Sequence, residues 1–564
     1  MKKRILAAML AAAMAISMAA CTGGGDSSAP DSGSSESSVS ASGTSGGESE
    51  ANAPAGENGT VWDAYTPYDE TVVFTTCRQK PAYDQGFVNG DDILNNPYTR
   101  YVEEVVNVRR EIAWEADPNT YPQKLALSVA SGDIPDVMFV DRKMYKQLIQ
   151  NDLIQDMGEA YEKCTSPFLK EKYDSYGERL FQECTVDGKL MGLPETSIYG
   201  NGVYLCWIRT DYLDKVGLEI PQNIEELKAA VKAFVENDVS GTGETIGFSV
   251  NTKMKEYAST FFYADGNYPG WWVNGEGEKA VYGSTLPEMK TTLERLRDMY
   301  ADGILDKEFA IRKDEDRNAM IASGQTGIFF GGWWPSAAMG DCVVNNKEAD
   351  WAPIAIKNTE GGLAVPEADP VYQILVVNKN FEHPEAIVKA HNVYFDAIRG
   401  NGDGKRIYDE IAETCPNIDW GVGPVPLNCD DYDAIKLLTD DLNQALEKGD
   451  KSAMKVQSQS MNFDIIMEER NNPKQSAGNY VMAMARTVGS EAITADYITI
   501  NPTAYFGTTE TMTNKWANLQ KLEDEMFVQI VMGEKPIEYF DEFVTQWYAL
   551  GGQTITDEVN AEMK

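Results

Sequence analysis

The chain has 564 residues, of which 43% are hydrophobic and 24% are charged, as in a water-exposed globular protein. Its formal net charge of −39 excludes a nucleic-acid-binding protein, which needs a basic surface. Because a single hydrophobic core stops growing at about 250–300 residues, the length predicts two large lobes.

The N-terminus has the pattern of a secretory signal. Residues 1–20 combine a basic start, an apolar stretch and small residues at the end. The apolar stretch is too short to span a bilayer, which favours a cleaved signal. The string MAAC at 18–21 resembles a lipoprotein processing site, which predicts a lipid on Cys21. The alternative is an ordinary signal followed by a coincidental cysteine.

A low-complexity segment follows the signal. Residues 22–58 are mainly Gly, Ser, Ala and acidic residues, with no Lys, Arg or aromatic residue. A segment of this composition buries too little apolar surface to fold. We therefore predict that residues 21–59 are the lipidated cysteine and a flexible tether.

Strand and helix patterns alternate in the first folded part. Residues 71–77 and 109–114 predict strands around a helix at 98–108, and a helix, turn and strand follow over 119–142. This alternation predicts a mostly parallel sheet, whose ligands bind beyond the carboxyl ends of the strands. The loops that contain Arg78 and Asp141 fall at this edge.

The chain changes character between residues 187 and 234. A short strand ends at Pro194, and the apolar run 203–208 predicts a second strand. Asp211 is predicted to cap a short helix that stops at Gly217. Asn223 is predicted to start a longer amphipathic helix with core positions at Leu227, Ala230, Val231 and Phe234.

Strings from several parts of the chain resemble one known family. GKLMGLPE, WIRTDYLDKVG and PQNIEEL in the central stretch, with LGGQTITDEVN near the end, resemble extracellular solute-binding proteins of family 1. The resemblance covers residues 61–564, although 401–504 match only loosely. It implies an α/β, two-lobed periplasmic-binding-protein-like fold with hinge strands and a ligand cleft. The lobes implied are 60–197 plus 371–425, and 198–370 plus 426–564.

The same resemblance implies a function. The family's members are lipid-anchored receptors that capture a carbohydrate by lobe closure and deliver it to the permease of an ABC importer. It implies a monomer at the outer face of the cytoplasmic membrane, with no catalysis and no cofactor. Two alternatives remain: a receptor for a peptide or another solute on the same fold, and a surface glycoside hydrolase.

Two tryptophan pairs in Gly-rich loops are the candidate ligand platforms. A sugar ring has an apolar face and a rim of hydroxyl groups, so its site needs flat aromatic rings and polar partners. Neighbouring strand residues face opposite ways, so one ring of each pair is expected in the core, and Trp333 is predicted to face the ligand. The predicted ligand-binding residues are Trp333, Trp334, Trp271, Trp272, Asp265, Glu195, Asn201, Arg78, Asp141 and Tyr199.

Metal sites and disulfides have little support. Relatives often carry a calcium-type loop at 238–249, but here Ser240, Thr242 and Ser249 replace acidic ligands, which predicts a plain turn. Seven cysteines follow Cys21 without a C-x-x-C motif. Local disulfides 164–184 and 415–429 are one possibility in an oxidising medium, and seven thiols are the other.

The lipid anchor is tested by Cys21→Ser. Without the thiol no thioether-linked lipid forms, so we expect the protein to be released or misprocessed. The measurement is the membrane-bound fraction after detergent-free washing. Equal retention of the variant and the wild type would contradict the anchor.

Overall fold

The computed structural model describes residues 62–81, 85–416, 418–454 and 459–563. The predictions for the signal, Cys21 and the tether lie outside these residues. Within the described ranges, every helix is too short or too polar to cross a membrane.

A five-stranded sheet forms in the order β2-β1-β3-β13-β6. Its strands are β1 Val72–Gln79, β2 Val108–Ala116, β3 Val137–Val140, β6 Leu193–Thr196 and β13 Val371–Val377. β1 is parallel to β2 and β3, whereas β13 is antiparallel to β3 and β6. β6 therefore runs in the same direction as β1, β2 and β3, and only β13 runs against them, so the sheet is mostly parallel, as predicted.

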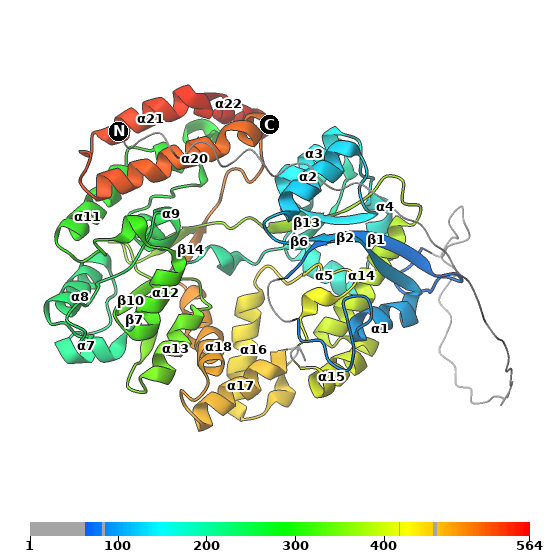
Figure 1. Ribbon diagram of the computed structural model, residues 1–564, viewed down its shortest axis with the longest axis horizontal. Helices are drawn as coiled ribbons and strands as arrows, with labels where there is room; N and C mark the ends of the chain where they lie inside the picture. The colour runs from blue at the N-terminus through cyan, green and yellow to red at the C-terminus, as the bar shows by residue number, and fades with distance from the viewer. Residues whose placement is uncertain (1–61, 82–84, 417, 455–458, 564) are drawn as a thin grey trace, which may run out of the picture. The chain divides into compact units, whose positions relative to one another are not determined.

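Helices cover both faces of this sheet (Figure 1). α1 (Pro97–Val106) and α14 (Pro384–Arg399) share one hydrophobic cluster with Phe74, while α2 (Tyr121–Ser131) and α3 (Arg142–Gln150) share another with Met138. The predicted strand, helix and strand over 71–114 correspond to β1, α1 and β2.

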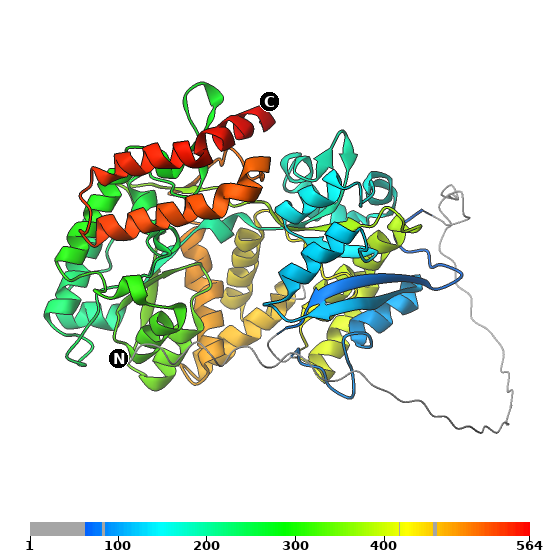
Figure 2. The same ribbon diagram turned by 45° about the horizontal axis from the view of Figure 1, so that its top comes forward.

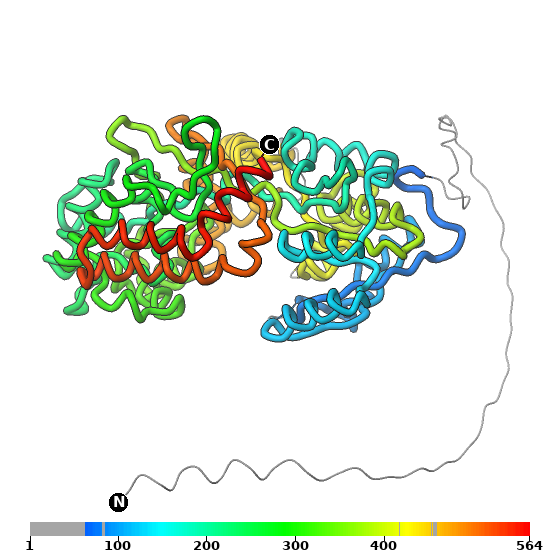
Figure 3. Tube along the Cα trace, turned by 90° about the horizontal axis from the view of Figure 1, so that it is seen from above, coloured from blue at the N-terminus to red at the C-terminus, as the bar shows by residue number. Residues whose placement is uncertain are grey.

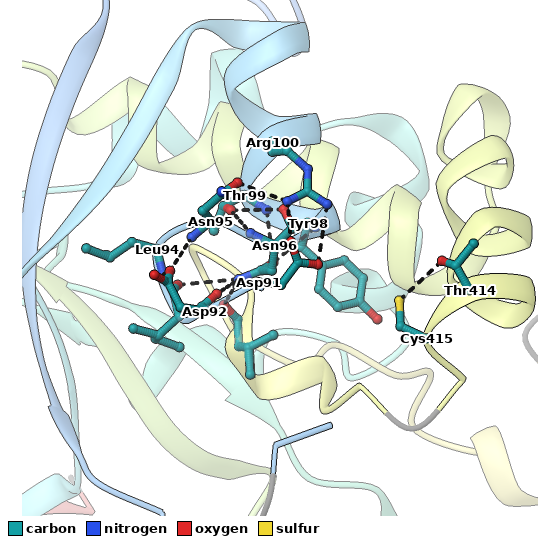
Figure 4. A network of polar contacts seen from close by, with 12 residues as sticks. Asp91, Asp92, Leu94, Asn95, Asn96, Tyr98, Thr99, Arg100, Thr414 and Cys415 are labelled. Carbon is teal, nitrogen blue, oxygen red and sulfur yellow. Dashed lines mark hydrogen bonds and ion pairs between the residues drawn. The ribbon is translucent and has the colours of Figure 1, made fainter. Parts of the chain in front are cut away.

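The loop before α1 is held by its own polar groups (Figure 4). The Asn96 side chain accepts hydrogen bonds from the backbone N–H groups of Tyr98 and Thr99, which caps α1. Its amide also donates to the carbonyl of Val422 at 3.4 Å, and the buried Arg110 donates to the same carbonyl at 2.9 Å. These bonds attach the loop to the segment that follows α14.

The second sheet has three antiparallel strands in the order β10-β7-β11. They are β10 Ile328–Gly331, β7 Leu205–Arg209 and β11 Trp351–Ile354. Trp207 of β7 stacks on Phe329 of β10 at 6.2 Å, inside a third hydrophobic cluster. α8 (Ile224–Glu236) buries the four predicted core positions of its apolar face.

The predicted cap at Asp211 is wrong. α7 (Thr210–Val216) begins one residue earlier, with Arg209 at the N-cap position and no side-chain cap. Both Asp211 oxygens accept hydrogen bonds from the buried Arg209 guanidinium, each at 2.6 Å. An unpaired, fully buried guanidinium costs more free energy than a helix end without a side-chain cap, so Asp211 pairs with Arg209.

The remaining strands and helices surround the two sheets. The further strand pairs are β4 Thr185–Val186 with β5 Lys189–Leu190, β8 Trp272–Asn274 with β9 Ala280–Tyr282, and β12 Leu363–Pro366 with β14 Ile498–Asn501. The further helices are α4 Gly158–Cys164, α5 Pro167–Asp174, α6 Arg179–Gln182, α9 Met254–Tyr257, α10 Ser259–Ala264, α11 Met289–Ala301, α12 Asp314–Ser323, α13 Ala337–Asn345, α15 Lys405–Thr414, α16 Ala434–Lys448, α17 Ser460–Asn471, α18 Ala477–Met484 and α19 Ser490–Ile493.

Three C-terminal helices pack together; the last two follow one another, and both lie against the first (Figures 2 and 3). They are α20 Glu510–Val531, α21 Tyr539–Trp547 and α22 Gln553–Glu562. Their apolar residues, among them Phe527, Phe543 and Ile555, belong to the same cluster as the second sheet.

Three crossing segments join the residues of the two sheets and bond to one another. The Thr196 N–H donates to the Asn428 carbonyl at 3.1 Å, and the Ser197 N–H donates to the Pro370 carbonyl at 2.8 Å. The Tyr199 N–H donates to the Tyr432 carbonyl at 3.3 Å. The connection therefore consists of three neighbouring segments that hydrogen-bond to one another rather than one isolated linker.

The cysteines of the described residues are all thiols. Cys77, Cys164, Cys184, Cys206, Cys342, Cys415 and Cys429 are free and buried. Of the two possibilities left open by the sequence, the structure has the thiols, which pack like small hydrophobic side chains.

Candidate functional site

A pocket of about 400 Å³ lies where β10 leads into α13. We call it the Trp334 pocket; its lining includes Asn201, Tyr204, Tyr257, Arg317, Trp334 and Ser336. Trp334 is 49% exposed, and Tyr204 donates a hydrogen bond to Glu256 at 3.1 Å. The pocket thus presents an accessible indole among hydroxyl, amide and guanidinium groups.

The choice of Trp333 as the ligand-facing ring is wrong. Trp333 is 5% exposed and belongs to the core cluster of the second sheet. Its ring lies 5.2 Å from that of Trp334, at an interplanar angle of 89°. β10 already ends at Gly331, so the alternation of a strand does not extend to this pair, and the turn before α13 directs the first ring inward.

A second pocket, of about 510 Å³, forms beside the other tryptophan pair. We call it the Trp271 pocket; its lining includes Lys143, Trp271, Asp369, Phe506, Trp516 and Gln520. Trp271 is partly exposed, whereas Trp272 is buried against Tyr282, with 5.4 Å between ring centroids. One ring of this pair is therefore accessible too.

The short helix α9 adjoins both pockets. Tyr257 at its end lines the Trp334 pocket. Lys255, two residues earlier, forms ion pairs with Glu523 at 3.1 Å and Asp524 at 3.3 Å. Both acids lie on α20, the helix that carries Trp516 of the Trp271 pocket. Lys255 also lies next to Gly270, which lines the Trp271 pocket, so α9 lies beside both pockets.

Several predicted site residues have structural partners instead. Asp265 pairs with Arg295 of α11 at 3.0 Å. Arg78 lies within β1 rather than in a loop, and it pairs with Glu115 at 3.4 Å. Asp141 caps α3 by accepting a hydrogen bond from the Met144 N–H at 2.7 Å. Neither pocket is lined by these residues.

The crossing segment places the other predicted residues apart from one another. Asn201 lines the Trp334 pocket and donates to Ser197 at 3.1 Å. Tyr199 lies against Tyr432, with 5.7 Å between ring centroids. Glu195 is buried in β6. Of the three, only Asn201 belongs to a described pocket.

Other pocket residues were missed from the sequence. Lys143, Tyr257, Arg317, Phe506 and Trp516 lie in segments that read as ordinary helices or loops. The one available signal was a tryptophan on the polar stretch TNKWANLQK, where an aromatic residue is out of pattern.

An ion-pair cluster fixes the linker beside the Trp271 pocket. Arg142 of α3 donates to Asp369 at 2.6 Å and to Glu183 at 2.7 Å. Arg179 of α6 pairs with Glu367 and donates to the Thr503 carbonyl. These contacts join α3 and α6 to the segment that leads into β13.

The 238–249 loop is closed by its own hydrogen bonds. One oxygen of Asp238 accepts from Thr245 at 2.7 Å and Ser240 at 3.2 Å, and the other accepts from the Gly243 N–H at 2.8 Å. Across the described residues, no cluster of three or more His, Cys, Asp or Glu side chains is arranged to hold a metal ion.

We predict that chelation has no effect on this loop. Addition of EDTA should leave the melting temperature and ligand binding unchanged, because hydroxyl groups occupy the positions where carboxylates would bind calcium. Thermal melts with EDTA and with added calcium test this. A calcium-dependent rise in melting temperature would contradict it.

Glu195 is a buried acid in the hinge. It is 6% exposed and accepts a hydrogen bond from Gln373 of β13 at 2.5 Å. Its pKa is raised to about 7, mainly by burial and also by nearby Asp430, against the lowering effects of the Gln373 and Asn428 hydrogen bonds. The folded chain therefore holds this proton more tightly than the unfolded chain does.

The raised pKa predicts a pH dependence of stability. The contribution of Glu195 is fully present below pH 4.5 and is lost as the pH rises through about 7. Relative to Glu195→Gln, the wild type should lose free energy of unfolding between pH 5 and 8, at about 1.4 kcal/mol per pKa unit. Denaturant melts of both proteins across this range test this.

The exposed Glu171→Gln serves as the control, since its side chain is 73% exposed. The control should follow the wild-type pH profile. If Glu195→Gln follows that profile as well, Glu195 is ionised in the folded chain and the assignment fails.

Comparisons with known proteins agree with this architecture. Residues 100–370 match a family described as bacterial extracellular solute-binding protein. Lipoprotein LipO of Bacillus subtilis (strain 168) is 20% identical over 479 residues, which cover 82% of this chain and 88% of LipO. The fructooligosaccharide ABC transporter substrate-binding protein FusA of Streptococcus pneumoniae serotype 4 (strain ATCC BAA-334 / TIGR4) is 24% identical, over 52% of this chain and 58% of FusA.

A solved structure shares the fold. The HMO binding ABC-transporter associated solute binding protein from Bifidobacterium longum infantis ATCC 15697 superposes with a TM-score of 0.58 at 16% identity. The alignment covers 88% of this chain and 99% of that one. The described chain therefore has the two-lobed α/β fold that the sequence predicted. Residues 100–370 thus match the bacterial extracellular solute-binding proteins, and the described chain shares the fold of a solved protein of that kind.

Proposed function

We propose that the chain captures an oligosaccharide between its lobes and delivers it to the permease of an ABC importer. The observation that carries this proposal is the pair of pockets beside α9, each with an accessible indole among polar side chains. An indole packs against the C–H face of a pyranose, and the polar groups bond its hydroxyls. FusA and the HMO-binding protein are relatives whose names include a sugar ligand.

Capture works by a shift between open and closed forms. A ligand that contacts both lobes stabilises the closed form by the free energy of the extra contacts. The proposed lobes are residues 60–197 plus 371–425 and residues 198–370 plus 426–564. The neighbouring crossing segments act as the hinge, and the permease recognises the closed form.

The proposal includes the location of the protein in the cell. A lipid on Cys21 anchors a monomer to the outer face of the cytoplasmic membrane, and residues 21–59 give it reach toward the permease. The acidic composition suits a solvated surface and leaves recognition to the pockets.

Binding without catalysis fits the pockets better than glycoside hydrolysis. A glycosidase needs two carboxyl groups about 5–10 Å apart. The described lining of the Trp334 pocket contains no Asp or Glu, and the carboxylate of the Trp271 pocket, Asp369, is held by Arg142. We therefore propose that no bond is made or broken. A peptide receptor remains the outcome to expect if peptides, and not glycans, bind.

The first test is a thermal-shift screen of the full chain against neutral and acidic glycans and peptides. A glycan at 100 times its Kd should add about 2.7 kcal/mol to the free energy of unfolding. Release of shorter products from a bound glycan would show an enzyme, and stabilisation by peptides alone would overturn the carbohydrate assignment.

The two neighbouring tryptophans give a matched pair of variants for the recovered glycan. Trp334→Ala should lower affinity at least tenfold, equal to about 1.4 kcal/mol, with a near-normal apo melting temperature. Trp333→Ala should lower stability by about 3–5 kcal/mol, because it leaves a cavity in the core. Calorimetric binding and apo melts of both variants are the measurements. Normal binding by Trp334→Ala would show that the site lies elsewhere.

A further inference from the structure

The Trp334 pocket is lined by a basic residue, although the chain as a whole is strongly acidic. The protein has 88 acidic and 49 basic residues, yet Arg317 is the only charged residue among the described residues that line this pocket. In a site shielded from water, a single charge dominates the choice of ligand because it is poorly screened.

Arg317 is buried and incompletely neutralised. It is 5% exposed, and its guanidinium stacks on the Tyr257 ring at 3.5 Å. Its one ion pair within the described residues is with Asp314 at 3.7 Å, longer than a charge-assisted hydrogen bond, and its Nε donates to the Ser249 carbonyl at 3.3 Å.

Asp314 is already occupied by other donors. Its oxygens accept hydrogen bonds from Asn251 at 2.9 Å, Lys253 at 3.0 Å and Tyr257 at 3.0 Å. A carboxylate shared in this way compensates a buried guanidinium only in part, and burial of an uncompensated charge is costly. A ligand anion would supply the missing partner.

The start of α13 adds positive potential to the same pocket. Pro335, Ser336 and Ala337 line the pocket, and Ser336 caps α13 by accepting a hydrogen bond from the Ala338 N–H. The N-terminus of a nine-residue helix carries a partial positive charge from its aligned peptide dipoles. The helix end and Arg317 thus favour the same kind of ligand group.

A second guanidinium lies beside the tryptophan pair. Arg486, in a π-helical turn at Ala485–Gly489, lies 4.8 Å from the Trp333 ring centroid. Within the described residues its Nε is buried without an acceptor, and the guanidinium has no ion pair. Burial lowers its pKa, with nearby Asp430 opposing and Arg399 reinforcing this effect. A second buried guanidinium therefore lies against the core side of the tryptophan pair, next to the pocket rather than in its described lining.

We infer that the Trp334 pocket recognises an acidic sugar unit, with the ring on Trp334 and its carboxylate directed to Arg317 and the start of α13. This inference rests on the proposed function and specifies the substrate class as an oligosaccharide that contains uronic acid. A guanidinium is suited to this role because it bonds both oxygens of a carboxylate.

The test compares uronate trimers with their methyl esters, which keep the ring and linkage but lose the charge. Trimers of galacturonate, mannuronate and guluronate are titrated into the full wild-type chain by calorimetry, with neutral galactotriose and mannotriose alongside. At least one acid should bind, its ester should bind at least tenfold more weakly, and added salt should weaken only the acid.

Two variants at the start of α12 then test whether Arg317 is the charge that recognises the carboxylate. Arg317→Gln should abolish the preference for acid over ester, whereas Lys313→Gln, an equal charge change at an exposed residue, should retain it. Should Arg317→Gln fail to fold, the wild-type acid and ester comparison still decides.

Each outcome separates the two proposals. Equal binding of acid and ester, or binding of neutral glycans alone, overturns the acidic-sugar inference and leaves carbohydrate capture standing. If the neutral and acidic trimers and the wider glycan screen all fail to bind, both the inference and the proposed function are wrong.

Discussion

The pairing of β6 with β13 is the constraint on which the rest of the structure depends. It joins Glu195 and Gln373, which are 178 residues apart, by a 2.5 Å hydrogen bond between antiparallel strands. Since the chain leaves the first sheet on one strand and returns on its neighbour, the residues between them must form a body with its own core. The cluster around Trp207 and Phe329 is that core.

The same constraint places the pockets. Both pockets adjoin α9, and the Trp271 pocket also receives Lys143 of α3 and Asp369 of the linker into β13. The ion pair between Arg142 and Asp369 holds this linker in position. Lys143, on a helix that covers the first sheet, therefore lies in the same pocket as Trp271 and Trp516 of the second body. A ligand there contacts both bodies, which is the physical requirement for a closing receptor.

Much of the fold was predictable because it depends on local pattern. The period of apolar residues identified β1, α1, β7 and α8, and Gly217 ends α7 in the left-handed conformation as expected. The antiparallel direction of β13 was not predictable from local sequence. It depends on the path that the preceding residues take before they return to the sheet. Asp211 pairs with Arg209 instead of capping α7 because Arg209 is buried, and this burial arises from tertiary packing.

The candidate site was less accessible to sequence reasoning. Accessible tryptophans line two pockets, but which ring of the Trp333–Trp334 pair is accessible depends on where β10 ends. The ion pairs of Asp265 and Arg78 could not be foreseen, because a charged residue beside a loop has the same local pattern whether it meets a ligand or an ion-pair partner. Arg317 had no local signal, because its burial and its shared carboxylate arise from packing.

A crystal structure of the chain with the tightest glycan of the screen tests the central claim most directly. The account predicts sugar rings against Trp334 and Trp271, with contacts from both bodies, among them Lys143 from the first. A glycan bound on a single body, or away from both pockets, would contradict it.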